Sequence, residues 1–147
     1  MIIKVLPNRI PKIWDLIKFA TAKTSGVISN LDALLNDLLH SLLSSKAQCF
    51  VRLSENQREV DAVIITKIML DNMSGEKYLL LQMYYAFKKG SEKDWEESMR
   101  LFIDLSKKEN CSSISFYTDN SKIAALADIH GFKKSKTGYE YRIKESV

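Results

Sequence analysis

The stretch that decides the fold is Ser-Ile-Ser-Phe-Tyr-Thr-Asp-Asn-Ser-Lys-Ile-Ala-Ala-Leu-Ala-Asp-Ile-His-Gly-Phe, residues 113–132. Its first residues alternate between polar and apolar side chains, which predicts a strand. Asn120 then suits a helix cap, and the apolar residues behind it predict a short helix. Gly131 suits the left-handed position that ends many helices, and we expect another strand to begin at Phe132. The stretch therefore predicts a strand, a helix and a second strand in close succession.

Hydrophobic periodicity assigns the remaining elements. Alternation or continuous apolar runs predict strands over residues 2–6, 48–53, 60–70 and 78–87, and a closing strand through Tyr139, Tyr141 and Ile143. Helices are expected to begin near Pro11, after a cap at Ser29 or Asn30, and after Ser91. The predicted order is β-α-α-β-β-β-α-β-α-β, which describes an α+β chain with a mixed sheet.

Two of these helices carry further signals. The helix after Asn30 has a leucine stripe, which could bind a partner but is more typical of a core-facing surface. Ser91 and Asp94 have the spacing of a capping box, with Asp in place of the usual Glu. The spacing therefore fixes where the third helix is expected to start.

Composition places the chain among globular proteins. It has 147 residues, 46% hydrophobic and 27% charged, which fits one domain over residues 1–147 with a core of its own. No apolar run is long enough to span a bilayer, so we expect no membrane association. The two cysteines, Cys49 and Cys111, cannot form a metal site by themselves, and they favour a cytoplasmic protein with reduced thiols.

Charge gives a weaker indication of partners. The formal net charge is +4, and basic residues gather near both ends of the chain. Such a patch can attract nucleic acid or a phosphorylated cofactor. Few aromatic residues are interleaved to stack bases, so the pattern argues against nucleic-acid binding. The number of subunits is not predicted by any of these features.

The order of elements, and the interval from Asn120 to Gly131 and Phe132, resemble the GNAT (GCN5-related N-acetyltransferase) family across nearly the whole chain. More narrowly, the strands at residues 79–85 and 113–120 and the helix through Trp95 look like a divergent GNAT-like group encoded by bacteriophages. The resemblance implies a sheet whose two central parallel strands, residues 78–87 and 113–117, splay apart. It also places the protein in the host cytoplasm, or in the virion if a phage encodes it.

The family binds acetyl-CoA in that wedge, so the resemblance implies acetyl-CoA or CoA as the cofactor. Main-chain groups of the first splayed strand would pair with the pantetheine arm, and a glycine-rich loop would hold the pyrophosphate. The residues that the resemblance assigns to cofactor binding are Tyr84, Tyr85, Lys88, Lys89, Gly90, Ser91 and Asn120. The loop has one glycine where the family has two, and Glu92 and Asp94 would repel an anion at the same helix start. A well-capped helix entry explains this loop equally simply.

Acyl transfer needs a base to deprotonate the amine and an acid to protonate the leaving thiolate. Many family members use a tyrosine of the last helix as the acid, and the matching position here is Ala127. The candidates that remain are Tyr117 as the acid and Asp61 as the base. A strand-end aromatic and a solvated strand carboxylate are the alternative interpretations of these two residues.

Two hypotheses follow. The first is an acetyl-CoA-dependent N-acyltransferase whose acceptor is an amine on a small molecule or a protein. The second is a catalytically inactive GNAT-fold module that serves a structural or interaction role, for example in a phage particle. The element order favours the first, while the single loop glycine and Ala127 favour the second.

Overall fold

The computed structural model describes residues 1–24, 30–118, 121–135 and 139–143, which belong to two units, Met1–Phe116 and Tyr117–Val147. The first unit begins with β1 (Ile2–Val5), a 3-10 turn (Pro7–Arg9), α1 (Ile10–Thr24) and α2 (Leu31–Leu43). It continues with β2 (Ala47–Leu53), β3 (Val60–Leu70), β4 (Lys77–Ala86), α3 (Glu92–Lys108) and β5 (Ser113–Ser115). The second unit contains α4 (Ser121–Ile129). Among the helices described, none combines the length and the apolar character that crossing a membrane requires.

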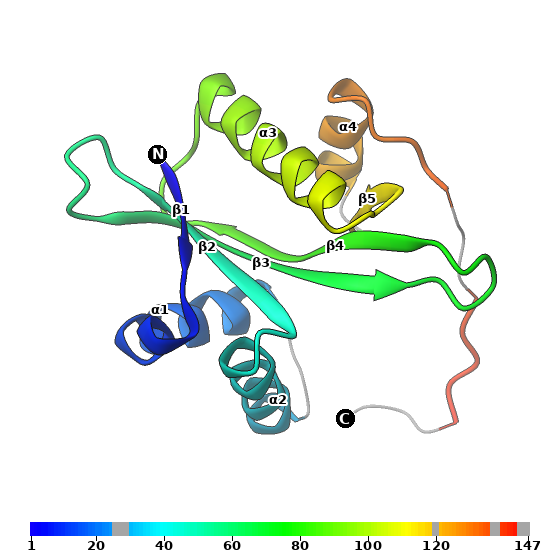
Figure 1. Ribbon diagram of the computed structural model, residues 1–147, viewed down its shortest axis with the longest axis horizontal. Helices are drawn as coiled ribbons and strands as arrows, with labels where there is room; N and C mark the ends of the chain where they lie inside the picture. The colour runs from blue at the N-terminus through cyan, green and yellow to red at the C-terminus, as the bar shows by residue number, and fades with distance from the viewer. Residues whose placement is uncertain (25–29, 119–120, 136–138, 144–147) are drawn as a thin grey trace. The chain divides into compact units, whose positions relative to one another are not determined.

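The sheet has its five strands in the order β1-β2-β3-β4-β5. The first three pairings are antiparallel, and the β4–β5 pairing is parallel (Figure 1). Helix α3 is the crossover between β4 and β5, which is the connection that a parallel pair requires. The predicted α+β fold with a mixed sheet is therefore confirmed, and β4 lies between β3 and β5.

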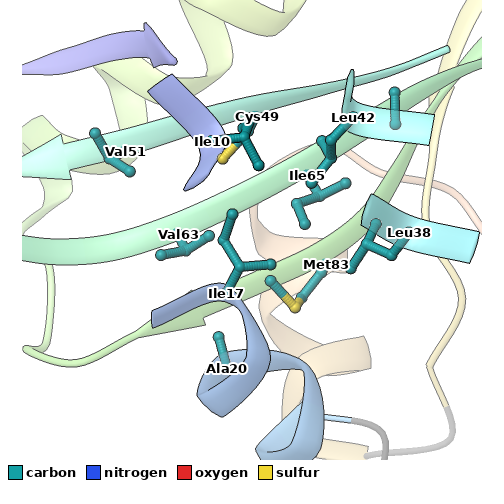
Figure 2. Close-up of a cluster of buried hydrophobic side chains, with 11 residues drawn as sticks. Ile10, Ile17, Ala20, Leu38, Leu42, Cys49, Val51, Val63, Ile65 and Met83 are labelled. Atoms are coloured by element: carbon teal, nitrogen blue, oxygen red, sulfur yellow. The ribbon is translucent and has the colours of Figure 1, made fainter. Parts of the chain in front are cut away.

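Each face of the sheet is covered by helices and has its own core (Figure 1). Helices α1 and α2 cover one face, where Ile17 and Leu38 pack against strand residues that include Val63 and Ile65 (Figure 2). Helix α3 covers the other face, where Phe102 is fully buried among Phe50, Ile64 and Leu79. Most of the leucine stripe of α2 is buried or half-buried, as expected for a core-facing surface.

A β-bulge in β4 reverses which residues face which core. Ile65 pairs with Met83 and Thr66 with Leu81, so Gln82 has no partner in the β3 register. Before the bulge, the odd-numbered Leu79 and Leu81 face α3; after it, the odd-numbered Met83 and Tyr85 face α1 and α2. An extra residue in one strand shifts the alternation by one and bends the strand.

Local signals set two helix ends as predicted. At α3, the Ser91 hydroxyl accepts from the Asp94 N–H and the Asp94 carboxylate accepts from the Ser91 N–H, which completes the capping box. At α4, Gly131 has φ +87°, Phe132 N–H donates to Ala127 O at 2.9 Å, and Gly131 N–H donates to Asp128 O at 3.3 Å. These two bonds form a Schellman motif, so the predicted stop is confirmed.

Two predictions about caps and strands are corrected. Asn30 occupies the N-cap position of α2, but its side chain makes no capping hydrogen bond. Residues 132–135 and 139–143 contain no strand, so the strand expected at Phe132 and the closing strand through Tyr139 are not formed in the described part of the chain. Alternation identifies the residues that a strand would bury, but a strand also needs a partner for its backbone hydrogen bonds. The Asn120 cap lies outside the described residues.

Candidate functional site

Strand β4 has an open edge beyond its third pair with β5. The parallel pairing joins Tyr78, Leu79 and Leu80 to residues 113–115, and β5 ends there while β4 continues to Ala86. On the side away from β3, residues 81–86 therefore have no strand partner within the described ranges. We call this segment the open edge. The bulge at Gln82 lies at its start, directly after the last residues of β4 that pair with β5, and a bulge bends the strand that carries it.

The phase of the β3–β4 hydrogen bonds shows which main-chain groups face outward at the open edge. Phe87 N–H donates to Asp61 O at 2.7 Å, so Phe87 points its donor toward β3. In an antiparallel pair the residues alternate between bonding the partner and facing away from it. Tyr84 and Ala86 consequently direct their N–H and C=O groups toward the open edge. An extended ligand with amide groups of its own could pair with them as a strand does.

The segment between β4 and α3, residues 87–91, ends at a helix start that already holds a carboxylate. Asp94 Oδ2 accepts from Ser91 N at 2.9 Å and from Ser91 Oγ at 3.1 Å. The hydrogen bond from the Ser91 backbone lowers the pKa of Asp94, and the charge of Arg52 adds to the effect. The capping box therefore uses part of the donor capacity that an anion would need at this helix N-terminus.

Arg52 is a buried cation beneath the same segment. Its side chain comes from β2 and is only 3% exposed. Its Nη1 donates to the Tyr84 hydroxyl at 3.2 Å, and its Nη2 donates to the Lys88 carbonyl at 2.5 Å. Both partners are neutral, and no carboxylate in the described part of the chain lies within 4.0 Å of the guanidinium. At longer range its charge acts on Asp94, whose pKa it lowers. A buried charge without a directly bonded carboxylate is costly, so Arg52 favours an anion at this corner of the protein.

Gly90 is required by Arg52. A Cβ atom at Gly90 would lie 2.6 Å from Arg52 Nη1 and 3.3 Å from its Cζ. Real Cβ atoms essentially never make contacts this short, so any side chain here would displace the guanidinium. The glycine therefore has a packing role that does not depend on a bound phosphate.

Lys88 and the predicted base Asp61 form a second charged group at the end of β4. Lys88 Nζ lies 2.8 Å from Glu59 Oε2 and 4.0 Å from Asp61 Oδ1. The Glu59 hydrogen bond raises the pKa of Lys88, and the same bond lowers the pKa of Glu59. Asp61 Oδ1 is buried and accepts no hydrogen bond. Asp61 lies on β3, so β4 separates it from the open edge.

The other candidates are more widely distributed. Tyr84 and Tyr85 face opposite cores, and Tyr85 contacts Phe19 and Phe87 on the α1 face. Lys89 and Ser91 are exposed at the start of α3. Tyr117, the predicted acid, is 76% exposed and belongs to the second unit. Asn120 lies outside the described residues. The roles that the sequence assigned to all of these residues stay predictions.

The sequence analysis did not identify Arg52, which alternates with the apolar Cys49, Val51 and Leu53 on its strand. Phe50 lies on the same side and is buried, which was the available signal that α3 covers this face as well. Elsewhere in the described ranges, no group of three or more His, Cys, Asp or Glu side chains could hold a metal ion.

No family model matches the chain, and no curated protein matches it. Solved structures do match it over almost its full length. A probable acetyltransferase has 11% identity and a TM-score of 0.73, and it covers 100% of this chain and 99% of its own. A predicted acetyltransferase of Clostridium acetobutylicum, solved with acetyl-CoA, has 12% identity and a TM-score of 0.72, covering 97% and 96%. A GNAT family acetyltransferase of Staphylococcus aureus has 13% identity and a TM-score of 0.63, covering 97% and 98%. The chain therefore has the fold of the GNAT acetyltransferases.

Proposed function

We propose that this chain binds acetyl-CoA or CoA along the open edge of β4 and acts as an N-acyltransferase. The observation that carries the proposal is the edge itself, where β5 ends at Ser115 while β4 continues to Ala86. The amides of a pantetheine arm could accept from and donate to the main chain of Tyr84 and Ala86. A ligand that completes a sheet edge gains hydrogen bonds that water otherwise makes.

Arg52 and two lysines support a phosphate-binding role for the segment between β4 and α3. The guanidinium is bonded to the Lys88 carbonyl and lies next to Gly90, and no carboxylate of the described residues lies within 4.0 Å of it. Lys88 and Lys89 are exposed on the same segment, Lys88 in an ion pair with Glu59, and the α3 N-terminus adds a partial positive charge. This arrangement favours the pyrophosphate of CoA although the loop has a single glycine.

The transfer itself would form one C–N bond and break one C–S bond. The amine attacks the thioester carbonyl, a base takes the amine proton, and an acid gives a proton to the departing thiolate. Main-chain N–H groups at the open edge could stabilise the negative charge that develops on the carbonyl oxygen. Asp61 as base and Tyr117 as acid remain predictions from the sequence. An amine on a small molecule or a protein is the acceptor class.

The alternative function is an inactive GNAT-fold module with a structural or interaction role. One observation favours it: Asp94 already occupies the α3 N-terminus with a carboxylate, which an incoming pyrophosphate would have to tolerate. A bacteriophage origin, and with it a place in a virion, stays a prediction from sequence resemblance alone.

A thermal-shift titration tests the proposal. Saturation of the folded state at about 100 times the Kd adds about 2.7 kcal/mol, which raises the Tm of a chain of this size by roughly 5–10 °C. The pair Lys88→Gln and Lys89→Gln should reduce this shift. The matched control is Lys107→Gln with Lys108→Gln, which removes the same charge from the opposite end of α3.

The two functions predict opposite results. If acetyl-CoA and CoA raise the Tm and only the first lysine pair weakens the effect, the cofactor binds where we propose. If millimolar concentrations of both leave the Tm of the wild-type protein unchanged, the acyltransferase proposal is wrong and the inactive module is the better account.

A further inference from the structure

An aromatic cluster lies beside the open edge, on the α1 face of β4. It consists of Phe19 from α1 and of Tyr85 and Phe87 from the end of β4. The Phe19 and Phe87 rings stack with their centroids 6.0 Å apart, and Tyr85 meets Phe87 edge-on at 5.1 Å. Phe19 is 48% exposed, so the cluster presents an aromatic surface to solvent.

Helices cover both faces of the sheet, and on the α1 face the cluster includes the exposed ring of Phe19. On the opposite face, α3 packs directly onto the sheet, and its Phe102 and Ser98 are fully buried. Tyr85 and Phe87 flank Ala86, whose main chain faces the open edge. A molecule that rests on the cluster would therefore lie next to a thioester that is held along that edge.

Lys23 gives the cluster a positive charge. Its Nζ lies 5.5 Å from the centroid of the Phe19 ring. No ion pair engages Lys23 anywhere in the described part of the chain, whereas Lys18, on the same helix, pairs with Asp15 at 3.4 Å. Lys23 is thus a cation next to an exposed ring, with its ion-pairing capacity free.

We propose that the aromatic cluster and Lys23 form the acceptor-binding surface, and that the acceptor is an amine that carries both an aromatic ring and a carboxylate. This inference rests on the proposed acyl transfer. Stacking on Phe19 would select the aromatic body, and Lys23 would bind the carboxylate. The amine nitrogen then forms the amide bond to the acyl carbon while the C–S bond breaks. The amine loses one proton to a base, and the thiolate gains one to leave as CoA.

Calorimetric titration with three probes tests the surface: L-phenylalanine, L-phenylalaninamide and L-alanine, each with and without saturating CoA. We expect L-phenylalanine to bind roughly tenfold more tightly than L-alanine, as loss of a stacked ring implies. It should bind roughly threefold more tightly than the amide, which lacks the carboxylate.

Matched variants on one helix separate the contributions. Phe19→Ala should weaken L-phenylalanine binding about five- to tenfold, and Leu16→Ala, which removes an exposed apolar side chain outside the cluster, should not. Lys23→Gln should erase the preference for L-phenylalanine over its amide, and Lys18→Gln should preserve it. The Tm and circular dichroism of each variant confirm that it is folded.

The result separates this inference from the function on which it rests. If CoA binds the wild-type protein but the three probes bind equally, or if Phe19→Ala has no more effect than Leu16→Ala, the acceptor surface is wrong and the cofactor proposal survives. If neither CoA nor any probe binds, both are wrong.

Discussion

Replacing Gly90 with alanine tests how the segment between β4 and α3 is held. The new Cβ would lie 2.6 Å from Arg52 Nη1, 3.3 Å from Arg52 Cζ and 3.4 Å from Asp94 Cβ. An arginine end group usually moves aside at little cost. Here the guanidinium is buried and bonded to Tyr84 and Lys88, so moving it breaks the Nη1 bond to the Tyr84 hydroxyl.

The structure sets the size of the effect. A hydrogen bond to a charged group contributes about 1.5–3 kcal/mol to stability. Alanine returns about 0.4–1 kcal/mol by restricting the unfolded chain. We therefore expect Gly90→Ala to lower the free energy of unfolding by about 1–2 kcal/mol. In an Arg52→Met background the clashing nitrogen is absent, so the same substitution should be close to neutral.

Urea unfolding of the four proteins of this cycle measures the coupling, provided that the m-values agree. Gly75→Ala is the control, because Gly75 has φ +74° and no atom within 4 Å of its Cβ position. Its cost should be the same with Arg52 or with Met at position 52. Equal costs of Gly90→Ala in the two backgrounds would refute the packing role of Arg52.

Three further predictions follow from single features of the structure. Hydrogen bonds from Ser91 lower the pKa of Asp94, so the ionised carboxylate stabilises the fold at neutral pH. This stabilisation is lost as the pH falls below 3.8, the ordinary pKa of the carboxyl group. In Asp94→Asn, the free energy of unfolding should therefore fall less steeply between neutral and acid pH. Burial raises the pKa of the Cys49 thiol from 9.0 to about 12, so stability should fall as the pH rises above 9, and Cys49→Ala should remove this part of the alkaline loss in urea titrations. Deleting Gln82 removes the bulge but keeps Met83 and Tyr85 on their native face, because Leu81 and Met83 would then oppose the adjacent residues Thr66 and Ile65 in a regular ladder; the deletion should keep cooperative thermal unfolding, whereas inserting one alanine after Tyr84 would turn Tyr85 toward the wrong core and should lower the Tm.

Local sequence signals predicted the parts of the fold that depend on neighbouring residues. The capping box at Ser91 and the stop at Gly131 each need only a few residues in sequence order, and both formed as predicted. The alternation of β2 and β3 likewise set their bounds. Such signals can be recognised in a sequence because the groups that form their hydrogen bonds lie within one or two helical turns of each other.

Features that depend on residues distant in sequence could not be predicted from local signals. The apolar run of β4 shows the same residue types on both sides of Gln82, so nothing in it marks the bulge that shifts its register. The burial of Arg52 depends on α3 covering its face of the sheet. The segment through Tyr139 alternates as a strand would, but no strand pairs with it in the described residues. Alternation indicates which face of a strand is buried, but the topology of the fold decides whether another strand pairs with it.

Backbone amide shifts test the central claim most directly, namely that the open edge of β4 takes the cofactor. In a 15N-labelled sample without ligand, the Tyr84 and Ala86 amides should exchange with solvent faster than those of Met83 and Tyr85, which face β3. Adding acetyl-CoA should then shift and protect the Tyr84 and Ala86 amides and leave the Met83 and Tyr85 amides nearly unmoved. Unchanged Tyr84 and Ala86 signals at millimolar acetyl-CoA would contradict the account.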